Sequence, residues 1–338
     1  MFTAIAWRRV TLRYTVFFQL RIPRYMSVYT TVEREHLETF LTSYDLGKLV
    51  AHEGISAGIE NTNYFVTTDS GEFVLTLFEQ YSFEELPYFL ELMAYLAAHN
   101  VPSAQPLADK AGHYLRELNA RPAALVRRLN GRDVSEPSVL HCAAIGKALG
   151  KLHQISPDFP HHRDNGRGED WRYATALKLV PLLNPSDAQI LREELEFQAD
   201  YCSQYLPRGV IHADLFRDNA LFEGDELCGL IDFYYACNDA LLYDVAVTVN
   251  DWCSASDGSL DPARADAFLS HYRQHRKLTT DECESWEMML RAAALRFWLS
   301  RLLSLHFPRE GEMTHIKDPN VFRDILIARR HIAPLKPD

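Results

Sequence analysis

One polar segment carries the residue types that transfer of a phosphoryl group requires. It reads His212-Ala213-Asp214-Leu215-Phe216-Arg217-Asp218-Asn219, and Asp232 follows thirteen residues after Asn219. A carboxylate such as Asp214 can orient an alcohol and accept its proton. Asn219 and Asp232 offer the oxygen atoms that Mg²⁺ prefers beside nucleotide phosphates. The segment therefore predicts phosphoryl transfer from ATP, with Mg²⁺ as the metal.

The elements around this segment are expected to bring its polar groups together. Two short apolar runs, 220–222 and 227–231, flank a polar turn that contains Gly224, which is typical of a β-hairpin. A hairpin returns to its starting point, so Asp232 can approach the loop that holds Asp214 and Asn219. A single Asp or Asn in a loop more often caps a turn than takes part in a reaction. Turn capping does not explain why Asp214, Asn219 and Asp232 occur in this order and at this spacing.

Two hydrolytic functions lack the residues that they would need. A metallohydrolase built on His212 and Asp214 would require further clustered histidines, and His161 and His162 lie in a distant polar segment. A serine hydrolase of the nucleophile-elbow type would require Gly-x-Ser-x-Gly, which does not occur in the sequence.

The His-x-Asp-x-x-x-x-Asn motif, with Ile231-Asp232-Phe233 after it, resembles the aminoglycoside phosphotransferase and choline kinase superfamily. Residues 58–66, 231–253 and 291–302 are similar to the homoserine kinases of that superfamily, and the similarity runs from about Met26 to near the C-terminus. The resemblance implies an α+β, protein-kinase-like fold of two lobes. It also implies an ATP-dependent kinase that converts L-homoserine to O-phosphohomoserine for threonine biosynthesis. Asp214 would be the catalytic residue, and Asn219 and Asp232 would bind Mg²⁺.

Two alternatives stay open on the residues alone. One is a kinase for choline, an aminoglycoside or another small amino alcohol, and a choline site should present several aromatic rings instead of a cation that binds a carboxylate. The other is a catalytically weak, pseudokinase-like module that only binds ATP. This second alternative rests on a missing lysine in the nucleotide-binding strand.

The small lobe is expected to span residues 26–130 and to bind the nucleotide. The pattern predicts helices over 33–42 and 83–99, strands over 48–51, 63–68 and 72–78, and a glycine-containing turn over 54–58. We expect Gly54, Gly58 and Asn61 to lie near the ATP phosphates, because backbone N–H groups in such a turn can bind anions. Backbone groups of Arg127 and Leu129 are expected to contact adenine at a hinge between the lobes.

The phosphate site departs from the superfamily pattern. Thr76 stands where many relatives carry a lysine, and no Lys or Arg occurs between Val50 and Lys110. Glu91, which matches the usual glutamate partner of that lysine, is therefore expected to lack it. Lys48 is a candidate for the replacement cation.

The second lobe, residues 131–338, is expected to be mostly helical and to bind the acceptor. Helical spacing occurs over 138–153, after Pro185, over 262–274 and over 281–307, whereas the polar segment 157–172 is expected to be a loop. A zwitterionic acceptor needs a carboxylate for its ammonium group and a cation for its own carboxylate. Asp251 is the candidate for the first role, and Arg296 and Arg301 are the candidates for the second.

Composition limits the partners and the compartment. The chain has 338 residues and a net charge of −11, which disfavours binding to nucleic acid. No apolar run reaches the roughly 20 residues that span a membrane. The six cysteines show no metal-binding spacing and are expected to be reduced thiols of a cytoplasmic protein. The sequence does not predict the oligomeric state.

Residues 1–25 form an atypical N-terminal extension. They contain five arginines and no Lys, Asp or Glu, which leaves −16 for the rest of the chain. We expect them to come from an upstream start and to be absent from the natural protein. A transit peptide is the alternative.

Overall fold

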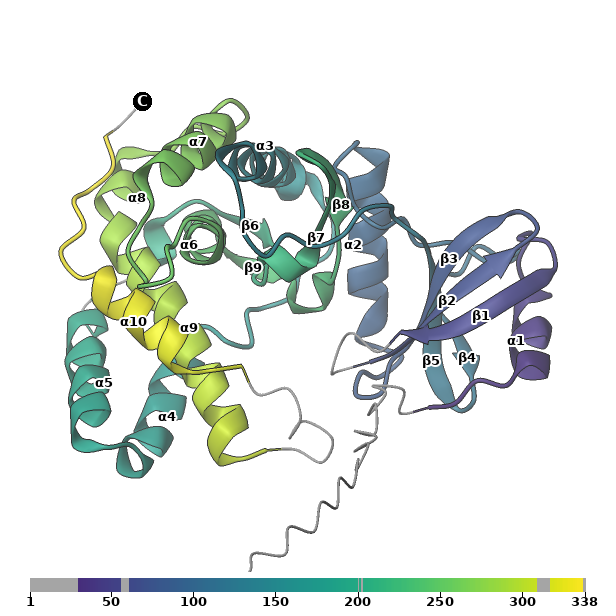
Figure 1. The fold of residues 1–338 in the computed structure, drawn as a ribbon, viewed down its shortest axis with the longest axis horizontal. Coiled ribbons are helices and arrows are strands. Elements are labelled where there is room, and N and C mark those ends of the chain that lie inside the picture. Colours follow the sequence, from purple (N-terminus) through teal and green to yellow (C-terminus); the bar gives the residue numbers. More distant parts are fainter. Residues whose placement is uncertain (1–29, 56–60, 200, 202, 309–316, 337–338) are drawn as a thin grey trace, which may run out of the picture.

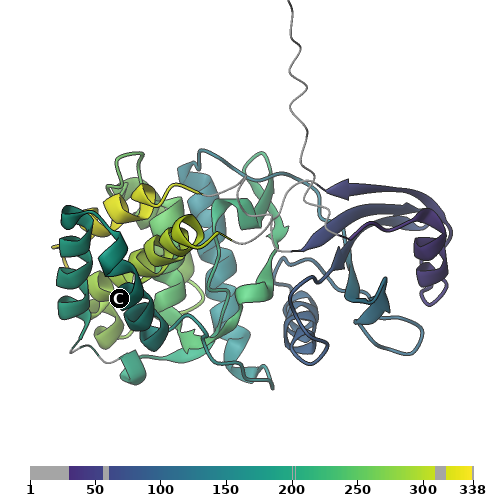
Figure 2. The same cartoon turned by 90° about the horizontal axis from the view of Figure 1, so that it is seen from below.

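The computed structural model describes residues 30–55, 61–199, 201, 203–308 and 317–336. An antiparallel sheet with one covering helix lies at one end of the molecule, and a larger helical part lies at the other (Figures 1 and 2). This is the expected α+β, two-lobe arrangement of a protein kinase. The expected extension 1–25 and the residue Gly58 lie outside the described residues.

The small lobe is built on a five-stranded sheet in the order β1-β2-β3-β5-β4. Its elements are α1 (Arg34–Leu41), β1 (Leu49–Ile55), β2 (Thr62–Thr68), β3 (Gly71–Leu77), α2 (Leu86–Ala98), β4 (Arg116–Leu118) and β5 (Arg121–Arg127). Alternate side chains of β2, including Tyr64 and Val66, are buried in one core with Leu37 and Phe40 of α1. Alternation of this kind is expected for a sheet that is covered on one face.

The expected turn over 54–58 is wrong at its start. Gly54 pairs with Tyr64 and Ile55 pairs with Asn63, so β1 continues to Ile55. The predicted strand over 48–51 is shorter than β1, because glycine is typical of turns but Gly54 is paired within the sheet. Cross-strand hydrogen bonds to β2 hold Gly54 in an extended conformation instead, and tertiary pairing here overrides local propensity.

The large lobe is mostly helical, as expected. Its elements are α3 (Val139–Ile155), α4 (Glu169–Leu179), α5 (Pro185–Gln198), β6 (Arg208–Ile211), β7 (Ala220–Glu223), β8 (Glu226–Leu230), β9 (Cys237–Ala240), α6 (Leu241–Trp252), α7 (Pro262–Arg273), α8 (Thr280–Glu284), α9 (Trp286–His306) and α10 (Asn320–Ala328). The expected loop ends before Glu169, where α4 begins. The expected helix over 281–307 is two helices that meet at Ser285.

Helix α9 packs against α6, α10 and α4 within the large lobe. Its apolar residues are buried on nearly all sides, including Trp298 at 1% exposure. One buried ion pair fixes its position, because Arg291 donates to both carboxylate oxygens of Glu194 on α5 at 2.8 to 3.2 Å. Side chains that α9 directs toward the loop over residues 212–219, such as Arg296, are therefore held on a rigid element.

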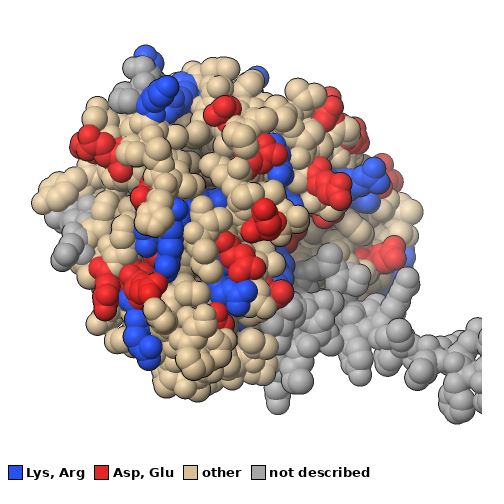
Figure 3. All heavy atoms as spheres, turned by 60° about the vertical axis from the view of Figure 1, so that its left-hand side comes forward, with Lys and Arg blue, Asp and Glu red and all other residues tan. Residues whose placement is uncertain are grey.

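Two observations concern possible partners. No helix within the described part of the chain is long and apolar enough to cross a membrane. On the face of the large lobe that Figure 3 displays, basic side chains are interspersed with acidic ones and form no continuous basic surface. Such a surface is what a nucleic-acid backbone would require.

Candidate functional site

The β7–β8 hairpin brings Asn219 and Asp232 together, as the sequence predicts. Ala220 pairs with Leu230, and the backbone N–H of Ile231 donates to the carbonyl of Asn219 at 3.0 Å. Asp232 follows directly with φ 61° and ψ 58°, a left-handed conformation that few residues other than Gly, Asn and Asp adopt readily. The backbone of Asp232 therefore lies close to Asn219, at the end of the loop over residues 212–219.

Asp214 lies in that loop with its side chain 18% exposed. The side-chain amide of Asn219 donates to the Asp214 carbonyl at 2.8 Å and to its Oδ2 at 3.3 Å. Burial raises the pKa of Asp214 above its ordinary value, and the Arg296 guanidinium, 3.5 Å from Oδ1, opposes the shift. A partly desolvated carboxylate with a raised pKa is better suited to accept a proton than a solvated one.

Asp244, at the start of α6, holds the backbone of the catalytic loop. Its two carboxylate oxygens accept from the N–H groups of His212 at 2.7 Å and Ala213 at 2.8 Å. The His153 imidazole lies 3.1 Å from the same carboxylate and 2.8 Å from the Tyr272 hydroxyl. Burial alone would raise the pKa of Asp244, but the hydrogen bonds from His153 and His212 hold it below its ordinary value. The Asp244 carboxylate therefore fixes the backbone of residues 212 and 213.

Folding stability is expected to decrease as the pH falls from about 7 to 5. Burial lowers the pKa of His153 and of His212, and nearby Asp244 only partly opposes this. The unfolded chain binds protons at these residues below about pH 6.5, where the folded protein excludes them. The free energy of unfolding should therefore fall by at most about 1.4 kcal/mol per pH unit for each histidine, until the pH reaches its folded-state pKa. Urea denaturation at several pH values measures this slope.

The variant His153→Gln should remove one histidine's share of that slope, because glutamine does not titrate. The matched control is His36→Gln, which changes an exposed histidine on α1 that contacts solvent in both states. A pH slope that is the same for His153→Gln and the wild-type protein would contradict the prediction.

Among the residues that the structure describes, the end of the sheet where β1 finishes and β2 begins holds polar groups but no lysine. Thr76 donates to the Asn63 side chain at 2.7 Å. Asn61 is 8% exposed, and its side-chain oxygen has no hydrogen-bond partner among the described residues. Lys48 precedes the opposite end of β1 and lies beside the Asp69 turn, so it cannot replace a cation at this end. The Lys48 hypothesis is therefore wrong.

Glu91 has a different partner from the lysine of relatives. Its carboxylate lies 2.6 Å from the imidazole of His161. This interaction ties α2 to the segment before α4. The hinge residues also have their own contacts. Arg127 donates its backbone N–H to the Gln105 carbonyl at 2.8 Å, whereas Leu129 packs against the core beside Gly229.

The three candidate acceptor residues have unequal surroundings. Asp251 accepts from the backbone N–H of Arg217 at 2.8 Å and from its guanidinium at 3.1 Å, so binding of an ammonium group would require this pair to open. Arg301 donates to the Asp318 carbonyl and lies over the Phe322 ring. Arg296 is 5% exposed and adjoins Asp214. Of the three, Arg296 is the one that adjoins the Asp214 carboxylate, at 3.5 Å.

The residues present fit a magnesium nucleotide better than a metal bound by protein groups alone. The described residues contain no cluster of three His, Cys, Asp or Glu side chains that could hold a metal ion. Mg²⁺ in nucleotide sites takes one or two protein ligands and completes its shell with phosphate oxygens and water. Because the Asn219 amide nitrogen is engaged with Asp214, its oxygen is the atom available to a cation.

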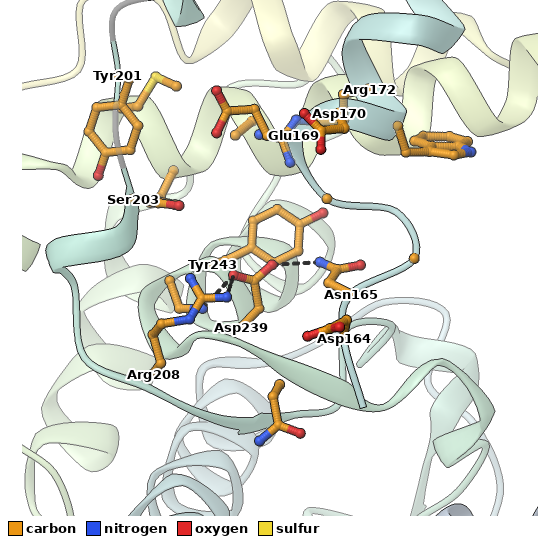
Figure 4. Close-up of a pocket in the computed structure, with 18 residues that line it drawn as sticks. Asp164, Asn165, Glu169, Asp170, Arg172, Tyr201, Ser203, Arg208, Asp239 and Tyr243 are labelled. Atoms are coloured by element: carbon orange, nitrogen blue, oxygen red, sulfur yellow. Dashed lines mark hydrogen bonds and ion pairs between the residues drawn. The ribbon is translucent and has the colours of Figure 1, made fainter. Parts of the chain in front are cut away.

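Two neighbouring cavities share residues 164–166 and Tyr243 as lining. The smaller one, about 200 Å³, reaches the catalytic loop at Ala213 and is also lined by Arg167, Tyr235 and Arg296. The larger one, about 500 Å³, lies between α4, α9 and β9 (Figure 4). In it Asp239 pairs with Arg208 at 3.0 Å and accepts from Asn165 at 2.6 Å. Sequence reasoning missed Arg167, which lies in a segment interpreted as a solvated loop.

Comparisons with known proteins agree with this geometry. Residues 51–278 match the sequence model of the phosphotransferase enzyme family. A homoserine kinase of Methylobacillus flagellatus is 53% identical over 301 residues, which are 89% of this chain and 94% of the relative. A homoserine kinase of Neisseria meningitidis is 45% identical, with 90% of this chain and 99% of the relative covered.

Solved structures of low sequence identity share the fold. An amicoumacin kinase in complex with AMP-PNP, Ca²⁺ and its antibiotic superposes with a TM-score of 0.64 at 16% identity, and covers 88% of this chain and 94% of its own. A putative aminoglycoside phosphotransferase of Ralstonia eutropha gives a TM-score of 0.65 at 14% identity, and the superposition covers 88% of this chain and 96% of that one. The motif, the hairpin that assembles it and the similarity over 89% of the chain agree, and the chain belongs to the phosphotransferase enzyme family and, within it, to the family of the homoserine kinases.

Proposed function

We propose that this protein phosphorylates the side-chain hydroxyl of L-homoserine with ATP, giving O-phosphohomoserine and ADP. The observation that carries the proposal is similarity over nearly the whole chain to homoserine kinases, at 53% identity in the relative from Methylobacillus flagellatus. The loop with Asp214, Asn219 and Asp232 supports a reaction that transfers a phosphoryl group to an alcohol. In this proposal the small lobe, residues 26–130, binds the nucleotide, and residues 131–338 provide the catalytic loop and the acceptor site.

In the proposed reaction Asp214 orients the homoserine hydroxyl and accepts its proton as the oxygen bonds to the terminal phosphorus of ATP. Asn219 holds the Asp214 side chain and backbone in place through its amide nitrogen. Asp232 and the Asn219 oxygen would hold Mg²⁺, which neutralises phosphate charge when it is bound. Asp244 fixes the loop backbone, so the geometry does not have to be organised during the reaction.

Gly54, Gly58 and Asn61 are proposed to contact the nucleotide at one end of the sheet, and Arg127 and Leu129 at the hinge. The buried side-chain oxygen of Asn61 supports the nucleotide contact, because it has no hydrogen-bond partner among the described residues and a hydroxyl or amino group of the nucleotide could donate to it. At Arg127 the backbone N–H is already engaged, so a nucleotide contact would use the carbonyl. Arg296 is the proposed partner of the acceptor carboxylate, and Asp251 and Arg301 stay predictions.

We also infer a cytoplasmic reaction, in which buried thiols such as Cys142 and Cys253 stay reduced.

An acceptor panel tests the proposed function. L-homoserine, choline, an aminoglycoside and simple amino alcohols would each be assayed with ATP and Mg²⁺ by coupled detection of ADP. We expect kcat/KM to be highest for L-homoserine, by at least about tenfold, because a matched ionic contact is worth more than about 1.4 kcal/mol. Preferred turnover of choline or an aminoglycoside would refute the substrate, and ATP binding without turnover of any acceptor would favour a pseudokinase.

A further inference from the structure

Two arginines in the smaller cavity flank the same aromatic ring. The guanidinium carbon of Arg167 lies 5.3 Å from the centroid of the Tyr235 ring, and that of Arg296 lies 5.2 Å from it. Helix α9 aligns both, because Arg296 belongs to it and Arg167 contacts Ser300 one turn further on, at 3.4 Å. Residues far apart in the sequence therefore bring two positive charges to one wall of the cavity that reaches the catalytic loop.

The charges on this wall are not balanced. Arg296 is shared with Asp214, 3.5 Å away. No carboxylate pairs with Arg167 within residues 30–55, 61–199, 201, 203–308 and 317–336, and its one polar side-chain contact is the Ser300 hydroxyl. A third arginine of the cavity, Arg163, differs because it pairs with Glu85 and lies over the Phe89 ring. One partly buried guanidinium thus remains available for an anionic ligand.

We propose that Arg167 and Arg296 form a subsite for the α-carboxylate of the acceptor, with Tyr235 as its floor. This inference rests on the proposed function and specifies how an amino acid is selected. A carboxylate between the two guanidiniums would relieve their mutual repulsion and place the rest of a small acceptor next to Ala213 and Asp214. The hydroxyl at the other end of a short amino acid would then be within reach of the catalytic carboxylate.

Other occupants fit this subsite less well. Choline and simple amino alcohols carry a positive charge without a carboxylate, and two guanidiniums repel them. An aminoglycoside exceeds a cavity of about 200 Å³, since pockets for drug-sized ligands hold roughly 300–1,000 Å³. The larger cavity would bind a carboxylate poorly. Its lining has four acidic residues and only two basic ones: Asp164, Glu169, Asp170, Asp239, Arg172 and Arg208 (Figure 4).

The test compares L-homoserine with 3-amino-1-propanol (aminopropanol below), which is homoserine with its carboxylate replaced by hydrogen. In Arg167→Met the KM for L-homoserine should rise roughly 10- to 100-fold, as expected for loss of a charged hydrogen bond. The kcat/KM for aminopropanol should stay within about twofold or increase, because that acceptor makes no use of the subsite. The KM for ATP should not change. This split between two acceptors separates a specificity role from a structural one.

Arg163→Met is the matched control, because it removes a cation from the same cavity that already has a carboxylate partner. We expect its KM for L-homoserine to stay within about threefold of the wild-type value. Thermal melting of each variant checks its folding. If Arg167→Met does not fold, Arg167→Gln, which keeps polarity but loses the charge, should give the same rise in KM.

The outcomes separate this inference from the proposed function. If wild-type protein phosphorylates L-homoserine and Arg167→Met keeps its KM, the subsite is wrong and the function stands. A rise confined to the KM for ATP would likewise overturn the subsite, by assigning Arg167 to the phosphates. If the wild-type protein does not phosphorylate L-homoserine at all, the proposed function fails, and the subsite fails with it.

Discussion

Replacing Asp214 by Asn is expected to lower kcat by roughly 10²- to 10⁴-fold, which is the usual contribution of a positioned general base. The substitution keeps the size of the side chain and removes the oxygen that would accept the hydroxyl proton. It also removes the negative charge that adjoins Arg296 at 3.5 Å. ATP binding should change little, because Asn219 and Asp232 are left in place. Steady-state kinetics and calorimetric titration with ATP measure the two effects separately.

Asp218→Asn is the matched control for this prediction. Asp218 lies four residues further along the same loop, and its half-exposed carboxylate pairs with Lys317 at 2.7 Å. Removing such an exposed charge should change kcat by less than about fivefold. If Asp214→Asn retained turnover within tenfold of the wild-type value, Asp214 would not be the catalytic base, whatever its geometry.

Replacing Asp232 by Asn is expected to lower kcat/KM roughly 10³-fold at a fixed concentration of Mg²⁺. A metal ion that neutralises phosphate charge contributes several kcal/mol to the transition state, and each 1.36 kcal/mol is worth a factor of about ten. Asparagine tolerates the left-handed backbone at this position, where φ is 61°, so the variant tests the charge and not the fold. Part of the activity should return as the Mg²⁺ concentration is raised.

The control is Asp225→Asn in the β7–β8 turn of the same hairpin, where the carboxylate contacts Ser138 and His141. Its activity should depend on Mg²⁺ as in the wild-type protein. A loss of activity in Asp232→Asn with no change in the Mg²⁺ dependence would count against Asp232 as a metal ligand and leave only a structural role for it.

Sequence reasoning failed where a residue's partner comes from another part of the chain. The sequence near Asp251 gives no sign of a partner for its carboxylate. The fold places Arg217 beside it, and Arg217 donates to both carboxylate oxygens. Gly54 reads as a turn residue, but it is paired in β1 because Tyr64 of β2 lies opposite. Lys48 lies close in sequence to the nucleotide end of the sheet, yet the direction of β1 carries it to the other end.

The catalytic loop could be predicted because its assembly is local. A hairpin with a short turn joins Asn219 to Asp232, so residue types and spacing alone predict that the backbone before Asp232 returns to Asn219, as the hydrogen bond from Ile231 to Asn219 shows. The pairing of Arg167 with Arg296 around one ring was decided only by tertiary structure. The two arginines are more than a hundred residues apart, and only the packing of α9 against the segment before α4 places both charges on one cavity wall, because contacts between distant segments follow from the whole fold and leave no periodic pattern in either segment.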